Sequence, residues 1–151
     1  MTSEVSGTQK ALSELLIAYA DYLAANISLD AGRVARHLHE PWMYVMATRV
    51  VQGKTHADAE DFLKPGLAAL KEAGYARTDF PRLNAQLLGE GLAMISGEGV
   101  RYKTDGTQLA ALGMTYLWRQ VAGQWKLAVV TMHERSGVLP LEQVALPGSA
   151  A

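Results

Sequence analysis

From Pro81 onward the chain alternates between apolar and polar residues over long stretches, and this alternation decides most of what the chain can fold into. Four stretches show it: residues 82–88, 92–102, 109–121 and 124–134. A period of two residues indicates strands with one buried face. Asp105-Gly106 suits the positive φ angles of a tight hairpin turn, and Ala122-Gly123 is a weaker pair of the same length. The sequence therefore predicts a curved antiparallel meander.

The first part of the chain follows helical spacing instead. Apolar residues recur at steps of three and four over residues 8–25, which predicts an amphipathic helix. A shorter helix is predicted over residues 29–38. Ser28 or Asp30 lies near its start, where such side chains accept hydrogen bonds from free amides of the first turn.

A third helix is predicted between Thr55 and Gly74. Thr55 and Asp58 have the spacing of a capping box. Pro65 predicts a kink or a break within this helix, because proline removes one amide donor. Before it, residues 42–47 are rich in aromatic and branched side chains and predict the first strand, which residues 49–52 continue or pair with.

This order of elements predicts an α+β fold with helices packed on one face of a curved antiparallel sheet. A length of 151 residues with 49% hydrophobic content suits one domain. We expect a flexible N-terminus over residues 1–10, a single domain over 11–136 and a C-terminal tail over 137–151. The last residues, from Pro147, have the composition of a loose end.

Composition and charge exclude several classes of protein. A formal charge of −1 argues against nucleic acid as a partner. The absence of cysteine excludes disulfides and thiolate chemistry. The start of the chain is polar, and no apolar run approaches the about 18 residues of a membrane span. We therefore expect a cytoplasmic protein without a membrane partner.

The Ala122-Gly123 turn predicts the register of the last hairpin. Trp118 would oppose Leu127, and the same face would carry the pairs Tyr116–Val129 and Met114–Thr131, together with His133. This face is predicted to look inward. The opposite face is too apolar to be exposed only to water, and it is predicted to bind a partner. Its apolar residues include Leu117, Val130 and Met132.

Four segments also carry a resemblance to a known family: LSELLIAYADYLAANISLD, RHLHEPWMYV, GKTHADAEDFL and YLWRQVAGQWKLAVVTMHER. With them the chain resembles the nuclear transport factor 2-like superfamily, in particular its SnoaL-like (polyketide cyclase-like) branch, over roughly Leu12 to Glu134. The resemblance implies a cone, in which three helices pack on the concave side of the sheet and enclose a pocket. It also implies a homodimer through the sheet. It implies no particular reaction, because this fold hosts several chemistries and none.

Ketosteroid isomerases of the superfamily use a Tyr on the first helix, an Asp base on the first strand and a protonated Asp on a later strand. Matching puts Tyr19 near the Tyr, but Val45 or Met46 at the base. Glu98 is the one acid of residues 92–102. This isomerase chemistry is therefore not predicted.

Epoxide hydrolases of the superfamily need two Asp residues bridged by an Arg. Arg101 would serve as the Arg, but residues 108–134 contain no Asp. His37 and His39 invite a metal site, but they lie at a predicted helix end and have no obvious third ligand. Neither a metal nor another cofactor is expected.

His133 is the candidate catalytic residue, because an imidazole exchanges protons near neutral pH. Its alternative role is that of a hydrogen-bonded residue at the sheet rim. Arg101 is predicted to anchor an anionic ligand at the mouth of the pocket, or else to be a solvated strand end. The other predicted ligand-binding residues, which equally suit a core, are Tyr19, Trp42, Tyr44, Met114, Tyr116 and Trp118.

Three function classes follow. The first is a protein that binds a small, largely apolar or aromatic molecule in the cone, with acid–base chemistry at His133 as an option. The second is a non-catalytic dimerisation or ligand-sensing module of the same fold. The third is a metal-dependent oxygenase-like activity, for which ligands are hard to find. The sequence does not decide whether the protein is an enzyme.

Overall fold

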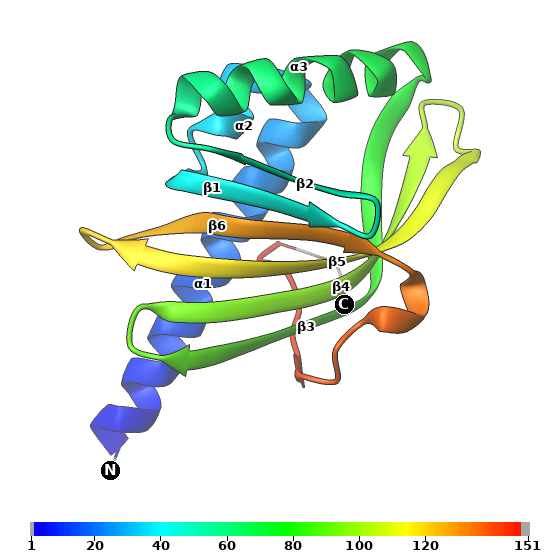
Figure 1. The fold of residues 1–151 in the computed structure, drawn as a ribbon. Helices are drawn as coiled ribbons and strands as arrows, with labels where there is room; N and C mark the ends of the chain where they lie inside the picture. Colours follow the sequence, from blue (N-terminus) through cyan, green and yellow to red (C-terminus); the bar gives the residue numbers. More distant parts are fainter. Residues whose placement is uncertain (1, 149–151) are drawn as a thin grey trace.

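The computed structural model describes residues 2–148, which form three α-helices, seven strands and one short 3-10 helix (Figure 1). The helices are α1 (Thr2–Ser28), α2 (Ala31–Ala35) and α3 (His56–Glu72). The strands are β1 (Leu38–Met46), β2 (Arg49–Gly53), β3 (Tyr75–Gly89), β4 (Leu92–Lys103), β5 (Gln108–Val121), β6 (Gln124–His133) and β7 (Glu142–Gln143). The 3-10 helix η1 spans Arg135–Gly137.

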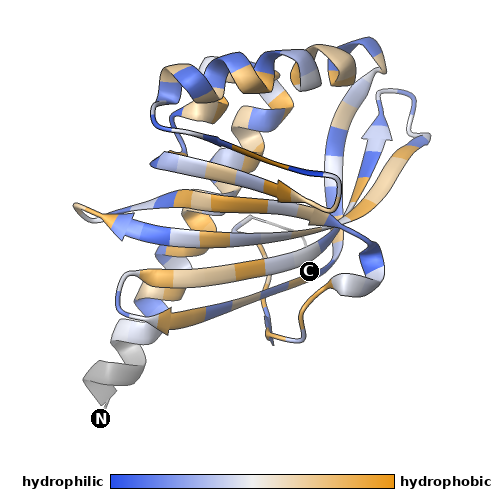
Figure 2. Ribbon diagram, in the orientation of Figure 1, coloured by the Kyte–Doolittle hydropathy of each residue, from blue (hydrophilic) through white to orange (hydrophobic). Residues whose placement is uncertain are grey.

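The strands form one curved sheet in the order β2-β1-β6-β5-β4-β3-β7. All neighbours are antiparallel except β1 and β6, which are parallel. The long helix α1 lies behind the strands, and α3 covers the end of the sheet beside β1 and β2 (Figure 1). Hydrophobic and hydrophilic positions alternate along the long strands (Figure 2). The predicted α+β fold with three helices on one curved sheet is confirmed.

The helix ends follow local chemistry. The Asp30 side chain caps α2 by accepting from the amide of Arg33, at 3.1 Å. Thr55 and Asp58 form the predicted capping box at the start of α3. Helix α1 begins at Thr2 rather than Thr8, so most of the segment expected to precede it is helical. Within residues 2–148, no helix has the length and apolarity of a membrane span.

Two prolines sit inside regular elements. Helix α3 runs through Pro65 without a break, and because Pro65 is exposed the carbonyl it leaves unpaired can reach water. Strand β3 includes Pro81, although the sequence placed its start after that residue. The ladder to β4 shifts between Asp79 and Arg82, so that Pro81 needs no ladder partner.

The register of β5 and β6 differs from the prediction beyond Trp118. Trp118 opposes Leu127 as expected, but Leu117 then opposes Val129, which leaves Ala128 as one extra residue. A one-residue bulge moves every later side chain of the strand to the other face. The predicted pairs Tyr116–Val129 and Met114–Thr131 are therefore wrong.

The observed partner of Tyr116 is Val130, and that of Met114 is Met132. Val130 is accordingly part of the buried core. Thr131 and His133 lie on the convex face, opposite Thr115 and Gly113. Of the apolar residues expected on the convex face, Leu117 remains there, and Val129 takes the place of Val130 and Met132.

Residues 135–146, here called the C-terminal strap, are held against the sheet. Strand β7 pairs with the free edge of β3. Beyond it, Val144 and Leu146 pack against the hydrophobic core. Residues 149–151 of the tail that was expected to be loose lie outside the described residues.

Candidate functional site

The concave face of the sheet carries a cluster of buried rings around α1. Tyr19 lies 5.2 Å from Tyr116 and 6.0 Å from Trp118 between ring centroids. Tyr44 lies 4.9 Å from Phe62 of α3. The structure thus brings together the predicted pocket residues other than His133 and Arg101, and all of them are buried: Tyr19, Trp42, Tyr44, Met114, Tyr116 and Trp118.

The tyrosine hydroxyls of this cluster are donors. Tyr19 donates to the Tyr116 hydroxyl at 3.3 Å, and Tyr116 donates to the Met114 sulfur at 3.0 Å. Burial raises the pKa of Tyr19, Tyr22, Tyr44 and Tyr116 above the ordinary tyrosine value. Each hydroxyl therefore keeps its proton near neutral pH, and none of them serves there as a base.

Two buried indoles of the core, those of Trp118 and Trp125, lack a hydrogen-bond partner among the described residues, and Trp118 is the one in contact with Tyr19. Trp118 is 0% exposed, and its Nε1 donates to no atom of the described residues. By contrast, Trp42 is 3% exposed and donates from Nε1 to the carbonyl of Thr55 at 3.0 Å. A buried donor without an acceptor costs about 1–3 kcal/mol. The cluster therefore contains one unused donor at its centre.

Arg101 enters the concave face from β4. Arg101 opposes Thr78 in the β3–β4 ladder, so the two side chains lie on the same face of the sheet. A Cβ placed at Gly99, two residues before Arg101, would contact the Thr78 methyl, so Gly99 faces the same way. Both strands therefore direct Thr78 and Arg101 to the concave side. The positive charge of Arg101 partly offsets the raised pKa of Tyr22. The Arg101 side chain is half-buried, and its guanidinium makes no ion pair or hydrogen bond with the described residues.

A hollow of about 380 Å³ lies between β3 and the C-terminal strap, and it is lined by Thr78, the ladder partner of Arg101, but not by Arg101 itself. Its apolar wall includes Phe80 and Leu83 of β3, and Val144 and Leu146 of the strap. Phe80 also contacts Tyr19, at 5.8 Å between ring centroids. One aromatic side chain therefore separates this hollow from the buried ring cluster.

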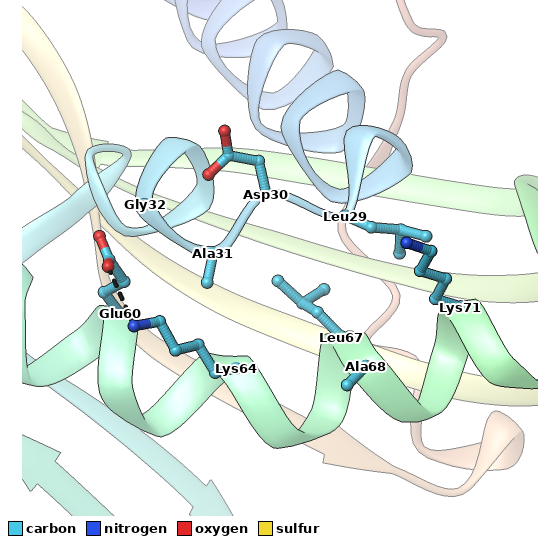
Figure 3. A pocket seen from close by; sticks show the side chains of 9 residues that line it. All are labelled: Leu29, Asp30, Ala31, Gly32, Glu60, Lys64, Leu67, Ala68 and Lys71. Carbon is cyan, nitrogen blue, oxygen red and sulfur yellow. Dashed lines mark ion pairs between the residues drawn. The ribbon is translucent and has the colours of Figure 1, made fainter.

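A second hollow, of about 370 Å³, lies between the α1–α2 turn and α3 (Figure 3). Its charged groups are largely engaged: Lys64 pairs with Glu60 at 3.4 Å, and Asp30 caps α2. Its floor includes Leu67 and Ala68. This hollow is lined by none of the predicted site residues.

The structure places His133 away from the predicted pocket. The residue is half-buried on the convex face, and its Nε2 lies 2.7 Å from Thr115 Oγ1. Thr115 in turn lies 2.8 Å from the hydroxyl of Ser96, which is 0% exposed. The expected placement of His133 in a cavity shared with Tyr19 or Tyr44 is wrong, because the bulge at Ala128 inverts its face.

Glu98 also lies on the convex face, so it does not serve the concave cluster as an acid. It is 6% exposed and forms ion pairs with Arg135 and with Arg82. The hydrogen bond from Arg135 is the main cause that holds the Glu98 pKa below its usual value. Glu98 therefore ties β4 to the first residue of the strap.

The sequence analysis missed the imidazole that touches the ring cluster. His37 is half-buried, and its ring lies 6.2 Å from that of Tyr22. Burial, followed by the charge of Lys126, lowers the His37 pKa below its ordinary value. Its position between the second helix and the first strand was the one signal in the sequence, and His37 was considered there only as a metal ligand, a role that was set aside.

His39 makes its own contacts, apart from His37. Nδ1 of His39 donates to the carbonyl of Pro41 at 2.8 Å, and its Nε2 lies 2.8 Å from Arg119. Among the side chains that the structure describes, no group of three or more His, Asp or Glu residues is placed to hold a metal ion.

Comparison with known proteins supports the fold. The family model described as NTF2-like protein (DUF6841) matches residues 9–135. A search of the curated proteins gives no match. The solved structure of an NTF2-like protein with a cystatin-like fold from Novosphingobium aromaticivorans is similar, with 15% identity, 91% of each chain covered and a TM-score of 0.70.

Two further solved structures share the fold. An NTF2-like protein of unknown function from Pseudomonas putida has 15% identity, with 83% of this chain and 87% of that chain covered and a TM-score of 0.67. The protein Aln2 from a Streptomyces species has 15% identity, with 84% and 92% covered and a TM-score of 0.65. These identities show the fold alone. The superfamily resemblance is confirmed, and the SnoaL-like branch stays a prediction.

Proposed function

Because the chain belongs to the DUF6841 family of NTF2-like proteins, we propose that it binds a small, largely apolar or aromatic molecule inside the cone of its sheet. The ring cluster around Tyr19 and the hollow beside Phe80 support this proposal, since both present aromatic and aliphatic surface. The ligand would enter from the hollow and displace Phe80 from the Tyr19 ring.

The observation that carries this proposal is the unpaired Arg101. The Arg101 residue is half-buried, and its guanidinium nitrogens are not among the buried atoms that lack a partner, so they are open to water and to a ligand. An anionic group on the ligand would supply a partner through a charge-assisted hydrogen bond. Trp118 Nε1 adds one unused donor on the same face, whereas the Tyr19 and Tyr116 hydroxyls already donate within the cluster. We therefore propose an aromatic carboxylate as the simplest ligand type.

Acid–base chemistry at His133 is not part of this proposal. The imidazole lies on the convex face, across the sheet from Arg101 and Tyr116. His37 is the imidazole in contact with the rings, and its lowered pKa leaves it neutral at pH 7. A neutral His37 is available as a proton acceptor if the bound molecule undergoes a reaction.

The test compares two naphthalene probes of similar shape, the anion 2-naphthoate and the neutral ketone 2-acetylnaphthalene, by calorimetric titration. We expect 2-naphthoate to bind about tenfold or more tightly, the factor expected of a hydrogen bond to a charged group. Arg101→Gln should reduce that preference to near one. Arg33→Gln, which changes an exposed arginine of α2, is the matched control and should keep the preference.

Two outcomes contradict the proposal. In the first, neither probe binds at millimolar concentration. In the second, Arg101→Gln and the wild type show the same preference, which would place the bound probe away from Arg101. Circular dichroism of each variant confirms that the fold is retained before binding is compared.

A second candidate function, a non-catalytic dimerisation module, is favoured by the convex face. Away from the strap this face carries half-buried apolar side chains on three neighbouring strands: Met43, Val45, Leu117 and Val129. We propose that a second copy of the chain covers this part of the face. Ligand binding in the cone and dimerisation through the convex face use different sides of the sheet, so one protein can do both.

A further inference from the structure

The C-terminal strap crosses from one face of the sheet to the other. On the convex face its Leu139 amide donates to Ser96 Oγ at 2.9 Å, and the Asn84 side chain donates to the Leu139 carbonyl at 2.8 Å. On the concave side the Val144 amide donates to the Leu83 carbonyl at 2.9 Å. One continuous segment is therefore anchored on the convex face and walls the hollow on the concave side.

The convex anchor is a chain of hydrogen bonds whose direction is fixed at both ends. His133 Nδ1 lies 2.8 Å from the Glu134 carbonyl, which only accepts, so Nδ1 carries the proton. Nε2 of the neutral ring is then an acceptor, and Thr115 donates to it. The Ser96 hydroxyl donates to Thr115 and accepts from the Leu139 amide. Each polar atom of this chain has a partner.

The His133 ring also touches the strap itself. A Cβ placed at Gly113 would lie 2.5 Å from the ring, and one placed at Gly137 would lie 2.9 Å from Nδ1. The imidazole therefore fits between a glycine of β5 and a glycine of the strap. With both ring nitrogens engaged and a glycine of the strap beside it, His133 is placed to hold the strap rather than to meet a ligand.

We infer that the C-terminal strap is the gate of the cone, and that the Ser96–Thr115–His133 chain is the latch that keeps it closed. This inference rests on the proposed ligand site, because it concerns entry to that site. When the strap leaves the edge of β3, Val144 and Leu146 no longer wall the hollow, and Phe80 becomes free to turn away from Tyr19. His133 is thus a positioning residue for the strap.

The latch is tested first without any ligand, by hydrogen exchange of the strap amides. Thr115→Val keeps the shape of the side chain but leaves His133 Nε2 without its donor and the Ser96 hydroxyl without its acceptor. We expect exchange of the Leu139 and Val144 amides to accelerate about tenfold, the factor of one buried hydrogen bond. The matched control is Thr131→Val on the neighbouring strand, whose hydroxyl donates to the Thr115 backbone carbonyl and lies outside the chain.

The gate is tested with a reversible cross-link. Asn84 and Gln143 oppose each other in the β3–β7 ladder, and opposed residues of antiparallel strands have Cα distances of about 4.5–5.5 Å, which a disulfide spans. The chain has no cysteine, so Asn84→Cys with Gln143→Cys creates the one possible disulfide of the molecule. We expect the oxidised form to bind 2-naphthoate at least tenfold more slowly in stopped flow, and reduction to restore the rate.

The outcomes separate the gate from the ligand site. Equal association rates in the oxidised and reduced forms overturn the gate while leaving binding intact. If 2-naphthoate binds neither form nor the wild type, the proposed function fails, and hydrogen exchange still decides the latch. Equal acceleration of strap exchange in Thr115→Val and Thr131→Val, or in neither, overturns the latch.

Discussion

Two matched tryptophan substitutions test the unpaired indole at the centre of the ring cluster. Trp118→Phe and Trp42→Phe each shorten a buried ring system on the concave face, at 0% and 3% exposure. The two indoles differ in one respect that matters here, since Trp42 Nε1 donates to the Thr55 carbonyl at 3.0 Å and Trp118 Nε1 donates to nothing in the described residues. The difference between the two substitutions therefore measures the cost of the unpaired N–H of Trp118 together with the contribution of the hydrogen bond of Trp42.

The expected magnitudes follow from the atoms removed. Each substitution deletes two ring carbons, at about 0.8 kcal/mol each, or roughly 1.6 kcal/mol of lost burial. Trp118→Phe also removes an unsatisfied donor and regains about 1–3 kcal/mol, so its net effect should lie within about 1.5 kcal/mol of zero. Trp42→Phe instead loses a hydrogen bond of about 0.5–1.5 kcal/mol, which brings its total cost to roughly 2–3 kcal/mol. The Thr55 carbonyl still accepts from the Ala59 amide.

Urea unfolding followed by far-ultraviolet circular dichroism gives both free energies, because tryptophan fluorescence is itself changed by the substitutions. Equal slopes with denaturant are required for the comparison. Trp118→Ala is the positive control and should cost about 3–5 kcal/mol, the usual range for a fully buried Trp. If Trp118→Phe destabilises the protein as much as Trp42→Phe, then Trp118 Nε1 has a partner and the argument for an unused donor is refuted.

Three further predictions concern charge and assembly. Glu98 has a lowered folded-state pKa, so its contribution to stability is present above the ordinary Glu value near 4.5 and is lost as the pH falls below it; Glu98→Gln should make the urea midpoint less dependent on pH in that range, and an unchanged dependence would contradict the ion pairs. His37 also has a lowered folded-state pKa, so the unfolded chain binds its proton first and stability should fall as the pH drops below 6.5; His37→Asn should flatten this slope, and a slope identical to wild type would reject it. Sedimentation velocity at micromolar concentration should show a dimer of 16.3 kDa chains that Leu117→Lys dissociates, while Ile17→Lys, on an exposed position of α1, leaves it intact; a wild-type monomer would contradict the dimer.

Much of the fold could be predicted because its signals are local. The capping box of Thr55 and Asp58 depends on two side chains three residues apart, and it forms as predicted. The Ala122-Gly123 turn has both residues at positive φ, 50° and 79°, as a tight hairpin requires, whereas at the Asp105-Gly106 turn between β4 and β5 only Gly106 has a positive φ, 87°. A short-range rule is enough wherever the residues that satisfy it are neighbours in the chain.

The candidate site could be predicted only in part, because its decisive features are two polar groups that lack a hydrogen-bond partner. Arg101 was placed at the mouth from its strand position alone, and that its guanidinium is unpaired is visible only once the surrounding strands are in place. The same holds for Trp118 Nε1, since nothing in the sequence distinguishes it from the paired Nε1 of Trp42. The strap was missed because residues 137–146 show no periodicity, and its anchors Ser96 and Asn84 lie about 40 or more residues away along the chain.

The placement of His133 failed for a reason that a period-two pattern cannot detect. The segment from Leu127 to Val130 is apolar at four consecutive positions, so alternation gives no preference for either face there. Both Leu127 and Val130 are buried, and a spacing of three is incompatible with a regular strand, whose inward positions are two or four apart. The bulge at Ala128 lets both side chains enter the core, and every side chain after it changes face. Because the bulge is needed to bury Val130 in the core, His133 lies on the convex side, where it contacts Thr115 and the strap.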